Sequence, residues 1–187
     1  MRKILNGFIV LSLLVMSCTK DAGPKTDARL SKLYCNDPQA VNYNWDFPGK
    51  PDNTLCFFPV DVFRGTYTFY DSVYDEDFQR NDSAYYDIKL IALDKSKFAI
   101  TGMCNKGVWT ESDTIPFTAD RFYKATVDST TLTDSVKLKG WLSTCKVSDT
   151  VNGFIMKDKA DTNLLHINLT FFTPHGPTYH IGTARKK

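Results

Sequence analysis

From Val60 to the end of the chain, apolar and polar side chains alternate in short runs. A period of two residues is typical of half-buried β-strands, and turn-forming residues separate the runs. No stretch shows the period of an amphipathic helix. Strands are therefore predicted at 61–70, 85–93, 97–104, 107–110, 114–118, 121–127, 136–142, 151–157, 164–172 and 178–184.

This number of short strands predicts an all-β fold: an antiparallel up-and-down barrel, with a β-sandwich as the alternative. In the strand at 164–172, the inward face is assigned to Leu165, Ile167, Leu169 and Phe171, and His166 is assigned to the outward face. The chain has 13 phenylalanines for one core, which favours a barrel filled by side chains. An interior ligand cavity is the alternative.

The first residues follow a different pattern, with Arg2 and Lys3 before an apolar run from Ile4 to Val15. A membrane-spanning helix needs roughly 20 apolar residues, and this run is shorter. It ends in Val15-Met16-Ser17-Cys18, which resembles the processing site of bacterial lipoproteins. The alternative is an ordinary signal peptide cut near Cys18.

The lipoprotein resemblance implies that residues 1–17 are removed and that Cys18 carries the lipid anchor. It also implies an extracytoplasmic protein attached to a membrane through lipidated Cys18. Thr19 stands where aspartate favours inner-membrane retention in such proteins, so the outer membrane is expected, with the protein on its periplasmic or cell-surface face.

The charge balance argues against a nucleic-acid partner. Without Arg2 and Lys3, the 23 basic residues become 21, which equals the number of acidic residues. A nucleic-acid-binding protein needs a basic surplus to attract phosphates, and this chain has none. We therefore expect no nucleic acid among its partners.

The remaining cysteines form an even set: Cys35, Cys56, Cys104 and Cys145. In an oxidising compartment an even set predicts disulfides, and four cysteines allow three pairings. We predict Cys35–Cys56 and Cys104–Cys145, because the first pair brackets a loop-rich segment and the second lies within the strand-rich part. No Cys-x-x-Cys spacing is present to indicate a zinc or redox site.

Between the leader and the strands lie two segments of different character. Residues 18–33 are polar and contain Gly23-Pro24, which predicts a flexible tether. Residues 34–60 are rich in turn-forming Asp, Asn, Pro and Gly. The predicted division is thus a signal peptide at 1–17, a tether at 18–33, a turn module at 34–60 and a β domain at 61–187.

Two internal stretches resemble parts of secreted Bacteroidota proteins. Residues 35–56 match a module of the pattern Cys-x-Asp-Pro-x-Ala-x-Asn-Tyr-Asn…Cys, although 52–55 is Asp-Asn-Thr-Leu where that module usually has Asp-Gly-Ser. Phe63-Arg64-Gly65-Thr66-Tyr67, followed by Asp71-Ser72-Val73-Tyr74, is similar to the first strand of lipocalin-like domains in Bacteroidota lipoproteins. The second resemblance implies an up-and-down barrel.

Hard oxygen atoms gather in the turn module, and calcium binds six to eight such ligands. The same residue types are also the usual turn formers, and no Asp-x-Asp-x-Asp-Gly array is present, so turn chemistry is the preferred interpretation. The residues concerned are Asp37, Asn42, Asn44, Asp46, Asp52 and Asn53.

No catalytic motif is present, and we predict no catalytic residue, no metal and no cofactor. The chain has three histidines, His166, His175 and His180. Exposed strand histidines are the preferred interpretation of His166 and His180, and a three-histidine metal site is the alternative. We expect a non-catalytic binding protein, for a small apolar or sugar ligand or a protein partner in an envelope complex. The alternative is a hydrolase of envelope or extracellular polymers.

Overall fold

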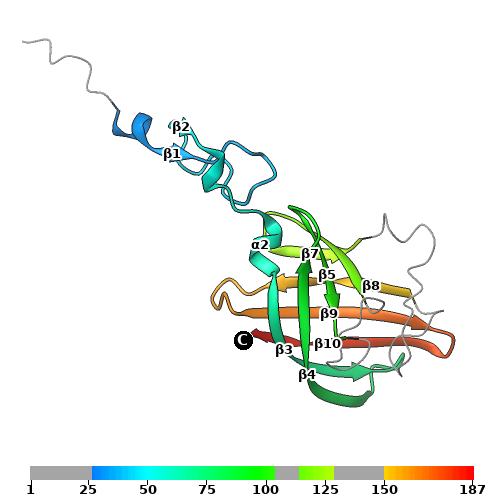
Figure 1. Cartoon of the computed structure of the whole chain (residues 1–187). Coiled ribbons are helices and arrows are strands. Elements are labelled where there is room, and N and C mark those ends of the chain that lie inside the picture. The colour runs from blue at the N-terminus through cyan, green and yellow to red at the C-terminus, as the bar shows by residue number, and fades with distance from the viewer. Residues whose placement is uncertain (1–26, 104–113, 129–149) are drawn as a thin grey trace, which may run out of the picture.

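The structure, a computed structural model, describes residues 27–103, 114–128 and 150–187. These residues form a small module at one end of a closed β-barrel (Figure 1). Several predictions lie outside the described residues: the signal peptide, Cys18, the strands at 107–110 and 136–142, and the Cys104–Cys145 disulfide.

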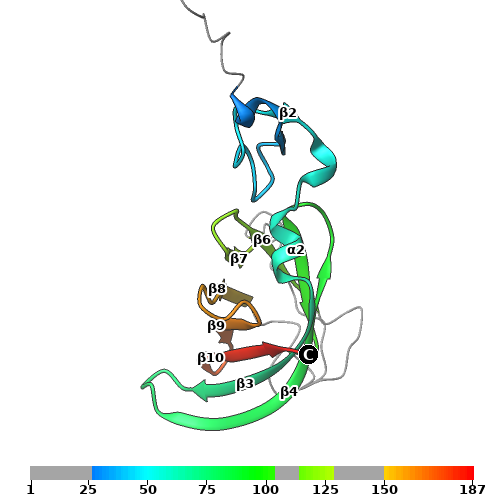
Figure 2. The ribbon, with the colours of Figure 1, turned by 90° about the vertical axis from the view of Figure 1, so that its left-hand side faces the viewer.

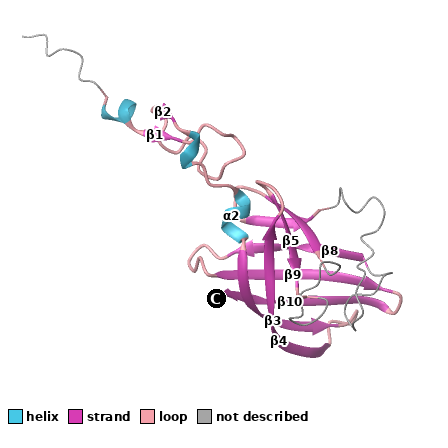
Figure 3. Cartoon of the chain, in the orientation of Figure 1, coloured by secondary structure: helices cyan, strands magenta, loops and turns pink. Residues whose placement is uncertain are grey.

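The barrel has eight described strands, and each pairs antiparallel with its neighbours in chain order (Figure 3). The last strand pairs with the first, and this pairing closes the barrel. The predicted up-and-down barrel is confirmed over the sandwich. The strands are β3 (Gly65–Tyr74), β4 (Arg80–Ala92), β5 (Lys97–Thr101), β6 (Ile115–Ala119), β7 (Lys124–Val127), β8 (Thr150–Lys157), β9 (Leu164–Thr173) and β10 (Gly176–Lys186).

The inward side chains form one buried cluster inside the barrel. The four residues predicted to face inward on β9 are all buried, and His166 is on the outer face as expected. The rings of Phe63, Phe98 and Phe117 stack in series, with centroids 5.3 and 5.4 Å apart. Burial of this much aromatic surface is the main stabilising contribution. The part of the barrel interior around these three rings is therefore filled by side chains, as the phenylalanine content predicts.

The strand predicted at 61–70 is placed too early in the chain. Pro59–Phe63 forms the short helix α2, and β3 begins only at Gly65. Pro59 occupies the first turn, where its fixed φ favours a helix, and the Asp61 carboxylate accepts a hydrogen bond from the Phe58 N–H at 2.9 Å. Phe63, at the end of α2, is fully buried. Tyr67 Oη donates to the Phe63 carbonyl at 2.8 Å, which fixes α2 over this end of the barrel.

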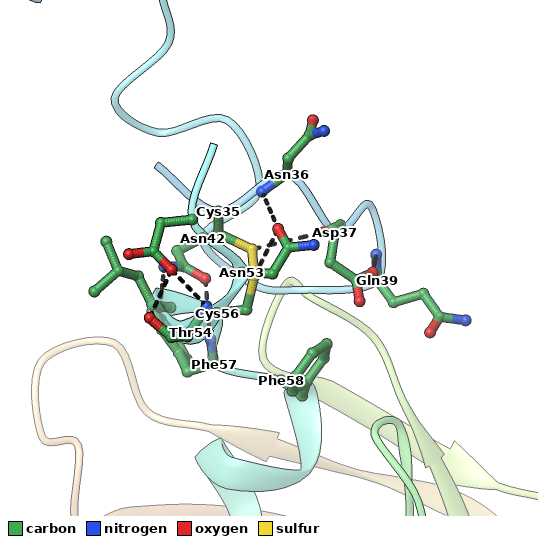
Figure 4. Close-up of a disulfide and its surroundings, with 12 residues drawn as sticks. Cys35, Asn36, Asp37, Gln39, Asn42, Asn53, Thr54, Cys56, Phe57 and Phe58 are labelled. Carbon is green, nitrogen blue, oxygen red and sulfur yellow. Dashed lines mark hydrogen bonds between the residues drawn. A yellow bond between two sulfur atoms is a disulfide. The ribbon is translucent and has the colours of Figure 1, made fainter. Parts of the chain in front are cut away.

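The turn module contains two parallel strands, β1 (Leu33–Tyr34) and β2 (Lys50–Pro51), and 3-10 helices at Ala28–Ser31 and Asn53–Leu55. The predicted Cys35–Cys56 disulfide is present (Figure 4). Within the segment predicted as a tether, residues 28–31 form a 3-10 helix and Leu33 begins β1. The Lys32 carbonyl accepts the Lys50 N–H at 2.7 Å, which ties this segment to β2.

The module lies against the end of the barrel that α2 closes (Figure 2). Val41 is buried and belongs to the same apolar cluster as the barrel interior. Lys95, in the turn between β4 and β5, forms an ion pair with Asp37 at 2.7 Å, and its Nζ lies 4.6 Å from the centre of the Phe58 ring. The Val60 N–H also donates to the Lys95 carbonyl at 3.1 Å. The module is thus fixed to the barrel by apolar, ionic and backbone contacts.

Candidate functional site

A hydrogen-bonded group of three residues is buried inside the barrel, toward the end opposite α2 and next to the apolar cluster, to which one of the three belongs. They are Asp71 on β3, Tyr86 on β4 and His180 on β10. Strand alternation directs them inward, because Asp71 continues the face of Tyr67 and Phe69. Asp71 and His180 are 2% and 1% exposed. Charged and polar side chains are seldom buried to this extent unless they have partners.

The Asp71 carboxylate joins the three side chains into one cluster. Its Oδ2 lies 2.8 Å from His180 Nδ1 and accepts a hydrogen bond from Tyr86 Oη at 2.7 Å. The barrel closure brings them together, because β3 pairs with β4 on one side and with β10 on the other. We call Asp71, Tyr86 and His180 the buried polar cluster.

Two polar atoms of this cluster have no hydrogen-bond partner among the described residues: Asp71 Oδ1 and His180 Nε2. A buried polar atom without a partner costs about 1–3 kcal/mol, and more if it is charged. Most buried polar atoms in proteins are paired with a protein group or an ordered water, so these two atoms can accept a water or a bound molecule as partner. A bound molecule that pairs with both atoms would remove this cost.

The protonation of the cluster defines what it can bind. Burial, with the nearby Asp71 charge, raises the pKa of the Tyr86 phenol far above its usual value, so Tyr86 remains a donor. In the His180 tautomer that donates Nδ1–H to Asp71, Nε2 carries a lone pair and can accept a hydrogen bond. Nε2 and Oδ1 are then both acceptors. In this tautomer, a complementary molecule presents two hydrogen-bond donors.

Aromatic rings pack against two members of the buried polar cluster. Phe171 contacts His180 edge to face, with ring centroids 4.7 Å apart, and Phe69 contacts Tyr86 in the same manner at 5.5 Å. Ligand sites commonly combine an apolar lining with a few placed polar groups. The cluster and these rings match that description.

The prediction that His180 is an exposed strand histidine is wrong. It shares a strand face with buried Ala184, and its Nδ1 pairs with a carboxylate on β3, which supplies the partner that burial requires. The alternation of the strand could have predicted this burial, because His180 lies on the same face of β10 as Gly182 and Ala184. His175 is exposed, and partly exposed His166 pairs with Asp158 at 2.9 Å. Within the described ranges, no three His, Cys, Asp or Glu residues gather as metal ligands.

The oxygen atoms of the turn module stabilise its own turns. Asn53 Oδ1 accepts the Asn36 N–H at 3.0 Å (Figure 4). The Asp52 carboxylate accepts hydrogen bonds from both the N–H and the hydroxyl of Thr54. Asn42 Oδ1 accepts the Phe57 N–H at 3.1 Å. These bonds support the turn interpretation over the calcium site.

No family model matches the chain, and no curated protein matches it. Among solved structures, a redesigned beta barrel, mFAP1, bound to DFHBI is 15% identical with a TM-score of 0.39, covering 68% of this chain and 98% of that chain. A structure described as EF1p2_mFAP2b bound to DFHBI is 10% identical with a TM-score of 0.40, covering 69% of this chain and 97% of that chain. Within the described part of the chain, no helix is both long and apolar enough to span a bilayer.

Proposed function

We propose that this chain is an outer-membrane lipoprotein, anchored through Cys18, whose barrel binds a small molecule without catalysing a reaction. The leader pattern that ends at Cys18 supports the anchor. The two buried acceptors without partners, Asp71 Oδ1 and His180 Nε2, carry the binding proposal. A protein selected for stability alone would gain from replacing them with apolar groups.

The proposed ligand is a small, mainly apolar molecule with two adjacent N–H or O–H donors. The donors would pair with Asp71 Oδ1 and His180 Nε2, and the apolar part would contact rings such as Phe171. A site built around hydrogen-bonding atoms rejects an analogue that lacks the matching groups, because its own polar atoms then stay unpaired.

Matched small probes test this chemistry. Catechol carries two adjacent hydroxyl donors, benzamidine carries paired N–H donors on its amidinium group, and toluene has similar bulk without donors. Titration is followed through the imidazole ¹⁵N signals of His180. We expect both donor probes to shift the Nε2 signal at millimolar concentration or below, and toluene to leave it unchanged.

Two histidine variants separate the site from a general effect. His180→Phe removes Nε2 and is expected to weaken probe binding by about tenfold or more, since one lost hydrogen bond is worth about 1 kcal/mol and the Asp71 contact is lost with it. His166→Phe alters a histidine on the outer face of β9 and should bind as wild type. Equal binding of toluene and catechol would contradict the proposal.

Hydrolysis is the second candidate function, because a histidine oriented by a carboxylate through Nδ1 is the arrangement of a general base. His180 Nε2 would then accept a proton from an attacking water. The test is turnover of chromogenic esters and glycosides. Turnover that is lost in His180→Gln but kept in His166→Gln would favour the enzyme over the binding protein.

A further inference from the structure

A concave surface lies between the turn module and the barrel, and it shares no residue with the buried polar cluster. It is a groove of about 440 Å³, within the range of roughly 300–1,000 Å³ that small-ligand sites occupy. The module forms one wall of the groove, and the turn between β6 and β7 forms another. The turn between β8 and β9 contributes one further residue. The lining residues are Val41, Tyr43, Trp45, Arg121, Phe122, Tyr123 and Lys159.

Two large aromatic side chains of the groove face solvent. Trp45 is 64% exposed and Phe122 is 70% exposed. Trp45 is held by an edge-to-face contact with Phe57, at 5.7 Å between ring centroids, and the Arg121 guanidinium lies 5.2 Å from the centre of the Phe122 ring. Exposed aromatic rings gathered around one concave surface mark interaction sites more often than scattered ones do.

The charge of the groove is positive. Arg121 and Lys159 line it, and no acidic residue does. The acids beside them in sequence are engaged elsewhere: Asp120 accepts the N–H groups of Phe122 and Lys124, and Asp158 pairs with His166. Among the described residues, neither cation of the groove forms an ion pair. Both cations are thus available to an anionic ligand.

The groove exists only because the module is fixed to the barrel. Val41 is buried at the junction, Asp37 pairs with Lys95 at 2.7 Å, and the Cys35–Cys56 disulfide closes the module. Trp45 and Tyr43 come from the module, whereas both cations come from the barrel. The two parts together form one composite surface of rings and positive charge.

We propose that this groove binds a segment of an acidic polysaccharide, with carboxylate or sulfate groups on its sugars. The apolar C–H face of a sugar ring packs on an aromatic ring, and Trp45 and Phe122 offer two such platforms. The anionic groups meet Arg121 and Lys159, and a guanidinium recognises carboxylate or sulfate through paired N–H donors. This site is independent of the buried polar cluster, so either proposal can fail alone.

Isothermal titration calorimetry of the full chain in detergent tests this proposal. The probes are oligogalacturonate (carboxylated), a chondroitin sulfate oligosaccharide (sulfated), a neutral cello-oligosaccharide and poly-glutamate. At least one acidic oligosaccharide is expected to bind more tightly than the neutral one, with an affinity that falls as salt rises. Failure of both acidic sugars, equal binding of the neutral sugar, or tighter binding of poly-glutamate would overturn the proposal.

Matched variants locate the binding. Trp45→Ala and Phe122→Ala are each expected to raise Kd by about tenfold, since each removes one apolar platform. Arg121→Gln and Lys159→Gln should weaken binding and reduce its salt dependence. The controls are Phe172→Ala, an exposed ring on β9 outside the groove, and Lys50→Gln on the module. Loss of affinity in the controls equal to that in the groove variants would contradict the assigned location, and near-UV circular dichroism verifies each fold.

Discussion

His180 Nδ1 lies 2.8 Å from Asp71 Oδ2, although the two residues are 109 positions apart in the chain. The contact depends on the pairing of the last strand, β10, with the first, β3. Both side chains are buried in the barrel, where a polar pair gives little net stability because both groups lose their hydration. A ligand that pairs with the remaining polar atoms of these two residues would offset this cost, as proposed above.

The first prediction compares partial with complete removal of the buried polar cluster. His180→Leu leaves Asp71 with only Tyr86 as its partner and should cost about 3 kcal/mol or more of unfolding free energy. The triple change Asp71→Leu, Tyr86→Phe and His180→Leu should restore stability to near the wild-type value or above it. Urea unfolding measures both. A triple variant less stable than His180→Leu would indicate a structural role for the cluster.

The second prediction concerns alkaline pH. Burial raises the pKa of the Tyr67 phenol to about 12, from its ordinary value of 10.0. Because the folded-state pKa is the higher one, this contribution to stability is complete below about pH 10 and is lost as the pH rises through 12. The ultraviolet absorbance of tyrosinate reports the ionisation of Tyr67, and urea unfolding at the same pH values reports the loss of stability. Tyr67→Phe should weaken this dependence and cost about 1–2 kcal/mol, because the Phe63 carbonyl loses its donor.

The third prediction concerns acid. Hydrogen bonds from His166 and from the backbone N–H groups of Asp161 and Ala160 lower the pKa of Asp158 to about 2, from 3.8. The stabilisation is present above about pH 4 and is lost as the pH falls toward 2. The urea midpoint should therefore fall over that interval. The urea midpoint of Asp158→Asn should fall less over the same interval. If its midpoint falls as much as that of the wild type, the acid sensitivity belongs to other carboxylates.

The fourth prediction concerns the closing seam of the barrel. Gly182 on β10 lies opposite Asp71, and a Cβ there would collide with the backbone carbonyl oxygen of Tyr70. Gly182→Ala should push β10 away from β3 and cost about 1–3 kcal/mol. It should also shift the ¹⁵N signals of His180. Thr183→Ala, at the adjacent position of the same strand, serves as the control and should leave those signals in place.

The fifth prediction concerns the module. Cys35 and Cys56 are 21 positions apart, and loss of a loop closure of that length costs about 3 kcal/mol in the chain-entropy account. Cys35→Ser with Cys56→Ser should therefore make residues 34–58 of the module, which precede α2, sensitive to protease while the barrel stays resistant. The same variant should lose binding of acidic sugar in the groove but keep binding of catechol in the barrel. Equal protection of module and barrel would contradict this division.

The sequence by itself determined the local structure of the barrel. Alternation placed the hairpin of β4 and β5 and that of β8 and β9, because a strand buried on one face repeats every two residues. It also assigned the inward face of β9, and the cysteine spacing predicted the Cys35–Cys56 disulfide. Alternation alone extended β3 too far back, because it has no means to weigh the helix-favouring Pro59 against the strand pattern.

Only the tertiary structure decided the two sites. Asp71 and His180 meet because the barrel closes on itself, and closure depends on the register of all eight strands together rather than on the sequence near either residue. The groove likewise requires Trp45 and Phe122, from separate parts of the chain, to be brought to one surface by the docking of the module. Local side-chain patterns report the face that a residue occupies. Which distant residue it meets there is set by long-range packing.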